Sequence, residues 1–394
     1  MHRRDFIRVL GGGTILAATG CAPADGPDPR AAWVNPGAGE TDPRRKALSF
    51  AILAPNPHNM QPWIVDLSVP DTITLYVDRT RLLPVTDPFN RQITIGCGGF
   101  LELLVRALGA LGRDSSVELF PDGEGRPLLD ARPLFRLRVG PAIPTGGPSP
   151  FADILKRRTN RGPYTEDTVS PESLGILKAN GSMGPTSLSV FSNGLDDSEP
   201  VAECDGTIDP ARVARLKALV YRGAEIEAHT PTAHHESVER TFIGARDVAD
   251  HPWGISLDSP VMTAMNAVGI LTKEKMSTPG TQAFAESLKF LKTGADTSRG
   301  FIWITTHGDS RIDEITAGRG YARANLQAAR IGLAMHPWSQ GLQEYASQKP
   351  VYDALHKELA PAGGRIQMLA RIGYPKAEVP PAPRRGLAAQ LKVS

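Results

Sequence analysis

Apolar residues along the chain alternate between helical and strand spacing. One apolar stripe with a spacing of three or four residues predicts a buried helix over residues 98–111. That stripe consists of Leu101, Leu104, Val105, Leu108 and Leu111. Other helices are expected at residues 43–54 and 151–158 and after Ser170, and strands at residues 64–67, 73–77, 135–139 and 301–305. The pattern predicts an α+β protein.

Segments rich in Pro and Gly divide these elements into regions. Residues 22–42 lack periodicity and indicate a linker, and residues 141–150 form the clearest internal linker. Residues 210–300 are mostly helical with polar faces, and no strand is expected there.

A short repeat indicates an internal duplication. Residues 93–98 have the sequence ITIGCG and residues 315–320 have ITAGRG, and each precedes a helix. The second helix has one core-facing stripe, made of Tyr321, Ala324, Ala328, Ile331 and Met335. We therefore predict a strand-plus-helix unit in each half, although chance similarity also produces so common a unit.

Composition excludes several classes of protein. The chain has 394 residues, of which 41% are hydrophobic and 22% charged, with a formal net charge of +2. This length suits two domains with buried cores. The charge is too small to imply a nucleic acid or an anionic membrane as partner. Cys97 and Cys204 match no metal-site or disulfide pattern and are expected to be buried.

The N-terminus carries an export address. Residues 2–8 resemble a twin-arginine motif, and the apolar run at residues 9–20 is too short to span a bilayer. Residues 18–21 resemble a lipoprotein cleavage box, whereas residues 22–24 suit ordinary signal peptidase. We expect a periplasmic protein, exported by the twin-arginine translocase and either lipid-anchored at Cys21 or released.

Two short motifs carry the candidate chemistry. Residues 156–161 have the sequence KRRTNR, whose guanidinium groups suit a dianionic phosphate, although a solvated charge cluster has the same composition. Residues 54–63 have the sequence APNPHNMQPW. In this loop Asn59 and Gln61 each offer a donor and an acceptor, as the edge of a flavin pyrimidine ring requires. A purely structural turn also explains the loop.

These motifs resemble the FMN-binding nitroreductase-like family, most closely its double-length Acg-type branch. The resemblance rests on the NxQPW core at residues 59–63, the arginine-rich segment before Tyr164, and the C-terminal runs at residues 371–375 and 383–385. In that family the arginine-rich segment normally comes first, whereas here it follows the loop by roughly 100 residues. This order implies two fused halves that each supply part of one site.

The resemblance implies a domain organisation. Residues 1–42 are assigned to the signal peptide and linker, 43–148 to the first nitroreductase-like half, and 149–394 to the second half with a helical insertion at about 205–300. An antiparallel-dominated sheet with flanking helices is expected in each half, with the insertion over the flavin pocket. Only one composite site is complete, so the implied protein is a monomeric pseudo-dimer with a single FMN.

The family's flavin contacts carry over residue by residue. The arginine-rich segment and the C-terminal arm match positions that hold the phosphate. The loop at residues 54–63, called the NxQPW loop below, matches the one that reaches over from a partner subunit to the flavin. Residues 337–339 match the segment that lies against the flavin ring. The predicted cofactor-binding residues are Asn56, Pro57, Asn59, Gln61, Arg157, Thr159, Arg161, Pro337, Trp338, Ser339, Arg384 and Arg385.

The resemblance implies an FMN-dependent oxidoreductase that reduces small electron-poor acceptors, nitro compounds or quinones, with NAD(P)H as a possible electron donor. The alternative is a flavin-binding or sequestering protein with a lidded, catalytically silent site. His58 and His336 lie inside the two flavin-facing segments, where they either donate protons to a substrate or pack structurally. No metal site is expected, because the histidines near Glu236 lack ligand spacing.

Overall fold

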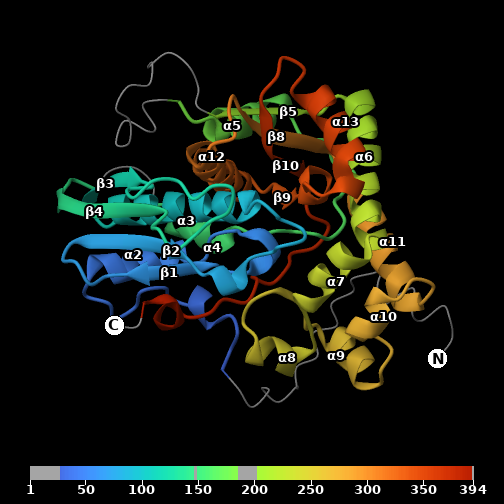
Figure 1. Cartoon of the computed structure of the whole chain (residues 1–394), viewed down its shortest axis with the longest axis horizontal. Coiled ribbons are helices and arrows are strands. Elements are labelled where there is room, and N and C mark those ends of the chain that lie inside the picture. The colour runs from blue at the N-terminus through green and yellow to red at the C-terminus, as the bar shows by residue number, and fades with distance from the viewer. Residues whose placement is uncertain (1–26, 146–148, 185–201, 393–394) are drawn as a thin grey trace.

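The computed structural model describes residues 27–145, 149–184 and 202–392 (Figure 1). Its mixture of helices and antiparallel sheets confirms the predicted α+β class. The twin-arginine motif, the cleavage box and Cys21 lie outside the described residues. So do residues 146–148, where the two predicted halves join, and that boundary stays a prediction.

The first half contains a four-stranded antiparallel sheet with the order β1-β2-β4-β3. Its strands are β1 (Trp63–Asp66), β2 (Thr72–Val77), β3 (Arg113–Leu119) and β4 (Phe135–Ala142). One hydrophobic core joins this sheet to helices α2 (Pro43–Ala51) and α3 (Arg91–Ala110). Along the chain the elements run helix, strand, strand, helix, strand, strand.

The second half repeats this order of elements with additions, since it begins with two helices, carries the insertion between its first two strands, and has a helix between its last two. Its antiparallel sheet has the order β5-β8-β10-β9, which is again first, second, fourth and third along the chain. The strands are β5 (Glu203–Thr207), β8 (Gly300–Thr306), β9 (Ala334–Pro337) and β10 (Arg365–Gly373). The helices are α4 (Phe151–Lys156), α5 (Pro171–Gly181), α12 (Arg311–Arg330) and α13 (Lys349–Leu359). The matching order supports an internal duplication.

The central helices α3 and α12 cross at two glycines. A Cβ atom at Gly98 would lie 2.1 Å from the Ile315 carbonyl oxygen, and one at Gly318 would lie 1.9 Å from that of Ile95. The two glycines are therefore equivalent positions, 220 residues apart in the sequence, as are the two isoleucines. The predicted repeat aligned the halves with a shift of 222 residues. The prediction of strands at residues 93–98 and 315–320 is wrong, because both segments lie inside buried helices whose β-branched residues resemble a strand.

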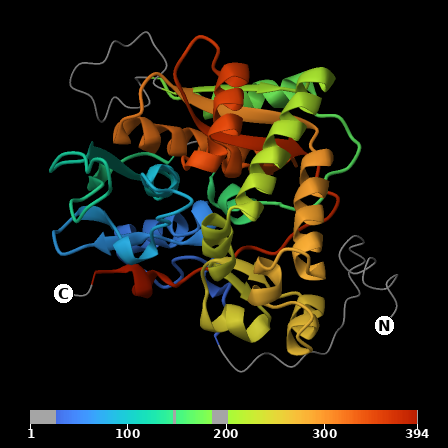
Figure 2. The same cartoon turned by 45° about the vertical axis from the view of Figure 1, so that its right-hand side comes forward.

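The insertion joins the two halves on one side of the molecule. It contains helices α6 (Pro210–His229), α7 (Pro231–Glu239), α8 (Ala245–Asp250), α9 (Pro260–Ala267), α10 (Lys273–Ser277) and α11 (Gln282–Asp296). Figure 2 shows these helices, in yellow to orange, running from the second-half sheet to the side of the first half. The prediction of no strand is wrong, because β6 (Thr241–Ile243) and β7 (Ile255–Leu257) form a parallel pair. Strands of three residues are too short to show a period.

The C-terminal arm returns from the second half to the first (Figure 1). After β10 the chain runs along the N-terminal segment, where the Arg384 amide donates to the Pro29 carbonyl oxygen at 2.9 Å. It ends beside β1, where the Lys392 amide donates to the Val65 carbonyl oxygen at 2.8 Å. The arm therefore brings residues of the second half to the loop that follows α2.

Candidate functional site

Arg157 lies at the junction of the two halves. It directly follows α4, and the residue is 2% exposed. Its Nη2 donates to the Leu53 carbonyl oxygen at 3.1 Å, and its Nη1 donates to Asn325 Oδ1 at 3.3 Å. Its Nε has no partner among the described residues. Burial lowers the pKa of this guanidinium to about 10, because no nearby charge compensates for its lost hydration.

Two further arginines complete a positive cluster around one tryptophan. The guanidinium carbons of Arg157, Arg158 and Arg384 lie 5.8, 5.1 and 5.5 Å from the Trp33 ring centroid. No described carboxylate forms an ion pair with any of the three, although Glu378 raises the pKa of Arg158 from a distance. Burying unpaired cations is costly, so the cluster favours a bound anion. Trp33 lies in the predicted linker, and that prediction fails here because the side chain is buried.

Thr159 and Asn160 hold the arginine-rich segment against the second-half sheet. Thr159 forms a parallel bridge with Met335 of β9, and the Asn160 amide donates to the Met335 carbonyl oxygen at 3.3 Å. Pro337 ends the same strand, and Trp338 and Ser339 follow it. The structure therefore places two of the predicted flavin-contacting segments side by side.

The ring-side segment is anchored by its tryptophan. Trp338 is 1% exposed, and its Nε1 donates to the Val220 carbonyl oxygen of α6 at 2.7 Å. Pro337 ends β9, and Ser339 begins a short 3₁₀ turn. The indole thus holds the insertion against this segment, and contact between Ser339 and a flavin stays a prediction.

The NxQPW loop has an unusual backbone. His58, Asn59 and Gln61 adopt φ values of +46°, +53° and +51°, in the left-handed region that non-glycine residues rarely occupy. The Asn56 Oδ1 accepts a hydrogen bond from the Gln61 amide at 2.7 Å, which closes the loop on itself. Strained backbone of this kind clusters at functional sites, where surrounding contacts stabilise it.

The amide side chains of this loop are committed to protein partners. Asn59 Nδ2 donates to the carbonyl oxygens of Gly254 and Pro383 at 3.1 and 3.0 Å. Gln61 Nε2 donates to the Pro252 carbonyl oxygen at 3.0 Å, and its Oε1 accepts from the Arg385 amide at 2.8 Å. These amides join the loop to the insertion and the C-terminal arm.

Arg384 is committed in the same way. Its Nε donates to the Ile52 carbonyl oxygen at 3.0 Å, and its Nη2 donates to those of Leu53 and Ala54 at 3.3 and 3.0 Å. Its Nη1 donates to Asn59 Oδ1 and to the Pro383 carbonyl oxygen. All five N–H groups are used, so Arg384 contributes charge to the cluster rather than a free donor. Its direct contact with a phosphate stays a prediction.

Two neutral histidines feel the charge of Arg161, an exposed residue. Burial, with the charges of Arg161 and Arg240, lowers the pKa of His58 to about 4. Burial, with Arg371 and Arg161, holds the pKa of His336 well below its ordinary value. His336 Nδ1 accepts a hydrogen bond from Arg371 Nε at 3.1 Å, so its single proton is on Nε2.

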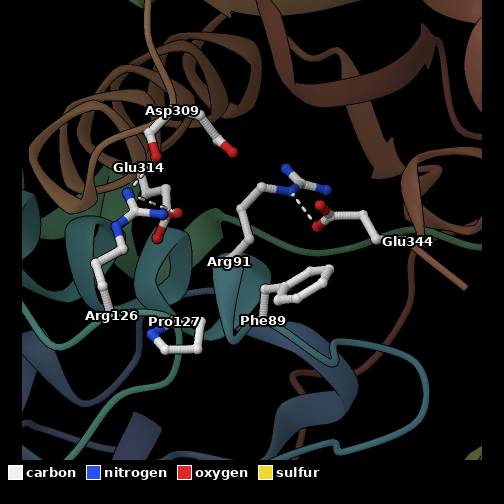
Figure 3. A pocket seen from close by; sticks show the side chains of 7 residues that line it. All are labelled: Phe89, Arg91, Arg126, Pro127, Asp309, Glu314 and Glu344. Carbon is white, nitrogen blue, oxygen red and sulfur yellow. Dashed lines mark hydrogen bonds and ion pairs between the residues drawn. The ribbon is translucent and has the colours of Figure 1, made fainter.

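A separate cavity of about 440 Å³ lies where α3 and α12 begin (Figure 3). Arg91 Nε lies 3.1 Å from Glu344 Oε2, and Arg126 Nη2 lies 3.8 Å from Glu314 Oε1. Its lining residues are Phe89, Arg91, Arg126, Pro127, Asp309, Glu314 and Glu344. Because its charges are paired with each other, this cavity is a weaker candidate for an anion than the arginine cluster.

No protein-family model matches the chain. A Mycobacterium tuberculosis protein provisionally named NAD(P)H nitroreductase Rv3131 is 28% identical over 351 residues, which cover 87% of this chain and 89% of that protein. A second protein of that organism, provisionally named NAD(P)H nitroreductase acg, is 36% identical over 128 residues, which cover 32% of this chain and 37% of that protein. This chain is similar along most of its length to a protein named as a nitroreductase, and over a third of its length to a second. The predicted resemblance to nitroreductases, Acg among them, is confirmed.

In a comparison with solved structures, nitroreductases match part of the chain. The FMN- and NADPH-dependent nitroreductase NfnB from Sphigopyxis is 14% identical, with a TM-score of 0.38, and covers 63% of this chain and 99% of its own. NfnB from Mycobacterium smegmatis, in complex with NADPH, is also 14% identical, with a TM-score of 0.34 and coverage of 60% and 94%.

Proposed function

We propose that this nitroreductase-like chain is an FMN-dependent oxidoreductase, which transfers two electrons from reduced nicotinamide to nitro compounds or quinones. The observation that carries the proposal is the buried arginine cluster without carboxylate partners, at the junction of the halves. The names of the curated relatives, which specify NAD(P)H and nitro reduction, support it. FMN would supply the two-electron redox chemistry when bound.

The residues present fit a flavin phosphate. Arg157 has an unpartnered buried Nε, and Arg158 adds a second guanidinium on the same tryptophan. The Thr159 hydroxyl and the exposed Arg161 extend the same segment towards the two histidines. A dianionic phosphate would neutralise this charge, because guanidinium groups pair with phosphate oxygens through two parallel hydrogen bonds.

We infer one flavin site per chain, in an intrachain pseudo-dimer. The arginines that begin the first half are already neutralised, since Arg44 lies 2.8 Å from Asp42 and Arg45 lies 2.9 Å from Glu40. The arginine cluster of the second half has no such carboxylates. The electrostatic contrast therefore favours one phosphate site.

A silent flavin-storage protein is the second candidate. The insertion covers the NxQPW loop through Ser237, Pro252 and Gly254, which contact His58, Gln61 and Asn59. A cover of this kind either shapes the acceptor pocket or excludes acceptors. Anaerobic mixing of the holo-protein with NADH or NADPH separates the two, because flavin bleaching followed by reoxidation with a quinone supports turnover. Flavin that stays oxidised with both nucleotides supports storage.

Arg161→Ala tests the phosphate site. Loss of one charge-assisted contact to phosphate costs about 2 kcal/mol, so FMN affinity should fall by about tenfold to a hundredfold. Riboflavin lacks the phosphate, and its affinity should change little. Fluorescence titration of both flavins with the wild type and the variant measures the difference.

Arg246→Ala serves as the matched control, because Arg246 is an exposed arginine of the insertion. It should leave both affinities unchanged. Equal losses for FMN and riboflavin in Arg161→Ala would show that the phosphate does not bind here.

We also propose export through the twin-arginine route, on the motif at residues 2–8. Cell fractionation of the full chain checks this, and a protein found only in the cytoplasm would contradict it.

A further inference from the structure

A chain of hydrogen bonds leads from the NxQPW loop into the insertion. His58 Nε2 lies 2.9 Å from Ser237 Oγ, and Ser237 Oγ donates to Glu227 Oε1 at 2.8 Å. Glu227 Oε2 accepts from Gln343 Nε2 at 2.7 Å, and Tyr345 Oη donates to Gln343 Oε1 at 2.8 Å. The chain joins α6, α7 and the loop of the first half, and the flavin contacts assigned above use none of its insertion residues.

His58 is unable to act as an ordinary acid at neutral pH. Burial lowers the pKa of its imidazole, and the positive charges of Arg161, after α4, and Arg240, after α7, lower it further. The pKa of about 4 leaves the imidazole neutral at pH 7, with a proton on one nitrogen only. A neutral imidazole gives up that proton only if its other nitrogen receives one at the same time.

The hydrogen-bonded chain supplies such a proton. Glu227 is 8% exposed, and burial raises the pKa of its carboxyl, as does the neighbouring Glu236 of α7. Hydrogen bonds from Ser237 and Gln343 oppose this shift without cancelling it. Glu227 is therefore a carboxyl that takes up a proton more readily than an exposed glutamate.

The observed positions of the oxygen and nitrogen atoms in this chain of hydrogen bonds are compatible with two arrangements of its protons. In the first, Glu227 is ionised, Ser237 donates to it, and His58 carries its proton on Nε2. In the second, Glu227 is protonated and donates to Ser237, Ser237 donates to His58 Nε2, and the imidazole proton is on Nδ1. His58 is neutral in both arrangements, as its environment requires.

We propose that His58, Ser237 and Glu227 form a proton relay that delivers one proton to the electron acceptor, a role that rests on the proposed oxidoreductase function. His58 Nδ1 gives its proton to the acceptor, Nε2 takes one from the Ser237 hydroxyl, and Ser237 takes one from the Glu227 carboxyl. The bonds Nδ1–H, Oγ–H and Oε1–H break, and three equivalent bonds form. To restore the starting arrangement, Nδ1 takes up a proton from solvent, Nε2 returns its proton to Ser237, and Ser237 returns its proton to Glu227.

The proton balance of quinone reduction requires such a source. A quinone takes up two electrons and two protons to become a hydroquinone. Reduced nicotinamide supplies the electron pair together with one hydrogen nucleus, and the relay supplies the second proton. Ferricyanide accepts an electron and no proton, so its reduction does not need the relay.

The order of groups excludes a hydrolytic triad. In such a triad the histidine lies between the serine and the carboxylate, so that it removes the hydroxyl proton. Here Ser237 lies between His58 and Glu227, and its hydroxyl is hydrogen-bonded to the carboxylate. The serine passes a proton and is not activated as a nucleophile.

Ser237→Ala breaks the relay at its centre. Holo-protein reduced with dithionite is mixed with benzoquinone or with ferricyanide, and reoxidation is followed by flavin absorbance. The ratio of the quinone rate to the ferricyanide rate should fall on the order of 100-fold in Ser237→Ala, as expected for loss of a general acid. Ser237→Thr keeps the hydroxyl and should restore most of the ratio. An unchanged ratio in Ser237→Ala would overturn the relay.

Ser287→Ala is the matched control, because in the described part of the chain the Ser287 hydroxyl donates to a carbonyl oxygen of its own helix, α11 of the insertion. It should leave the ratio unchanged. Failure of the proposed function gives a different result, because a protein that takes up no FMN, or that neither acceptor reoxidises, fails before the ratio is measured.

The histidine tautomer gives a readout that needs no turnover. In protein labelled with ¹⁵N-histidine, with His58→Gln to assign the signal, the His58 proton should move from Nε2 to Nδ1 as Glu227 is titrated to its acid form. Glu227→Gln should remove this pH dependence above pH 5. A wild-type His58 that keeps one tautomer throughout would overturn the relay, whatever the flavin does.

Discussion

His58 couples the candidate site to the pH dependence of folding. Its folded-state pKa of about 4 lies below the ordinary value of 6.5, so the unfolded chain binds a proton between these values and the folded chain does not. Stability contributed by the neutral imidazole is therefore lost as the pH falls from 6.5 towards 4.

Between pH 7 and pH 5, the free energy of unfolding of the wild type should fall by about 2 kcal/mol more than that of His58→Gln. Urea unfolding of both proteins at the two pH values measures this difference. The raised pKa values of Asp87, about 6, and Glu314, about 7, act in the opposite direction but are common to both proteins. Identical pH dependence in the two proteins would contradict the assignment.

At the residue scale, the sequence predicts which side chains could contact a flavin, but not which protein groups those side chains bond to instead. Arg157 contacts the Leu53 carbonyl oxygen just after α2 and Asn325 of α12, and its role towards a phosphate stays a prediction. Asn59, Gln61 and Arg384 were assigned to the same site, yet their side chains bond mainly to backbone carbonyls. Those carbonyls come from distant segments, and their positions follow only from the folded chain.

The crossing of α3 and α12 is the tightest contact between elements that the glycines report. A Cβ at Gly98 would overlap the Ile315 carbonyl oxygen, which belongs to helix backbone and has no room to move aside. Gly98→Ala should therefore destabilise the protein by about 3 kcal/mol or more, despite the higher helix propensity of alanine. Guanidinium unfolding gives the value.

Gly109→Ala is the control in the same helix, because no atom lies within 4 Å of its added Cβ. Alanine has the higher helix propensity, so this change should stabilise by about 0.5–1 kcal/mol. Opposite signs for the two variants identify the helix crossing as the cause. A shared sign would show that propensity alone decides.

At the element scale, amphipathic helices and strands with an apolar run could be predicted from the sequence. The helix at Pro43–Ala51 and the strand at Gly300–Thr306 agree with their predictions. β5 gives no alternating pattern because it is short and polar, with the sequence ECDGT. β10 is buried on both faces, and it includes the buried polar residues Gln367 and Arg371, so it lacks the period that marks a strand.

At the scale of the whole molecule, the halves are locked by two equivalent arginines. Arg91 begins α3 and donates to the Leu342 carbonyl oxygen of the second half at 2.9 Å. Arg311, 220 residues later, begins α12 and donates to the Pro127 carbonyl oxygen of the first half at 2.9 Å. Each half therefore satisfies carbonyl groups of the other, as subunits of a dimer do.

That near-symmetry makes flavin stoichiometry the test of the whole arrangement. A symmetric dimer would present two equivalent sites, but among the described residues the buried arginine cluster without carboxylate partners belongs to the second half, whereas the buried Arg91 of the first half is paired with Glu344. We expect one FMN per chain by calorimetric titration and native mass spectrometry. Arg157→Met should remove that single binding event. Arg45→Ala, which removes a first-half arginine that is paired with Glu40, should leave one event of unchanged affinity. Two flavins per chain, or one flavin shared by two chains, would contradict an asymmetric pseudo-dimer, because each requires both halves to bind phosphate alike.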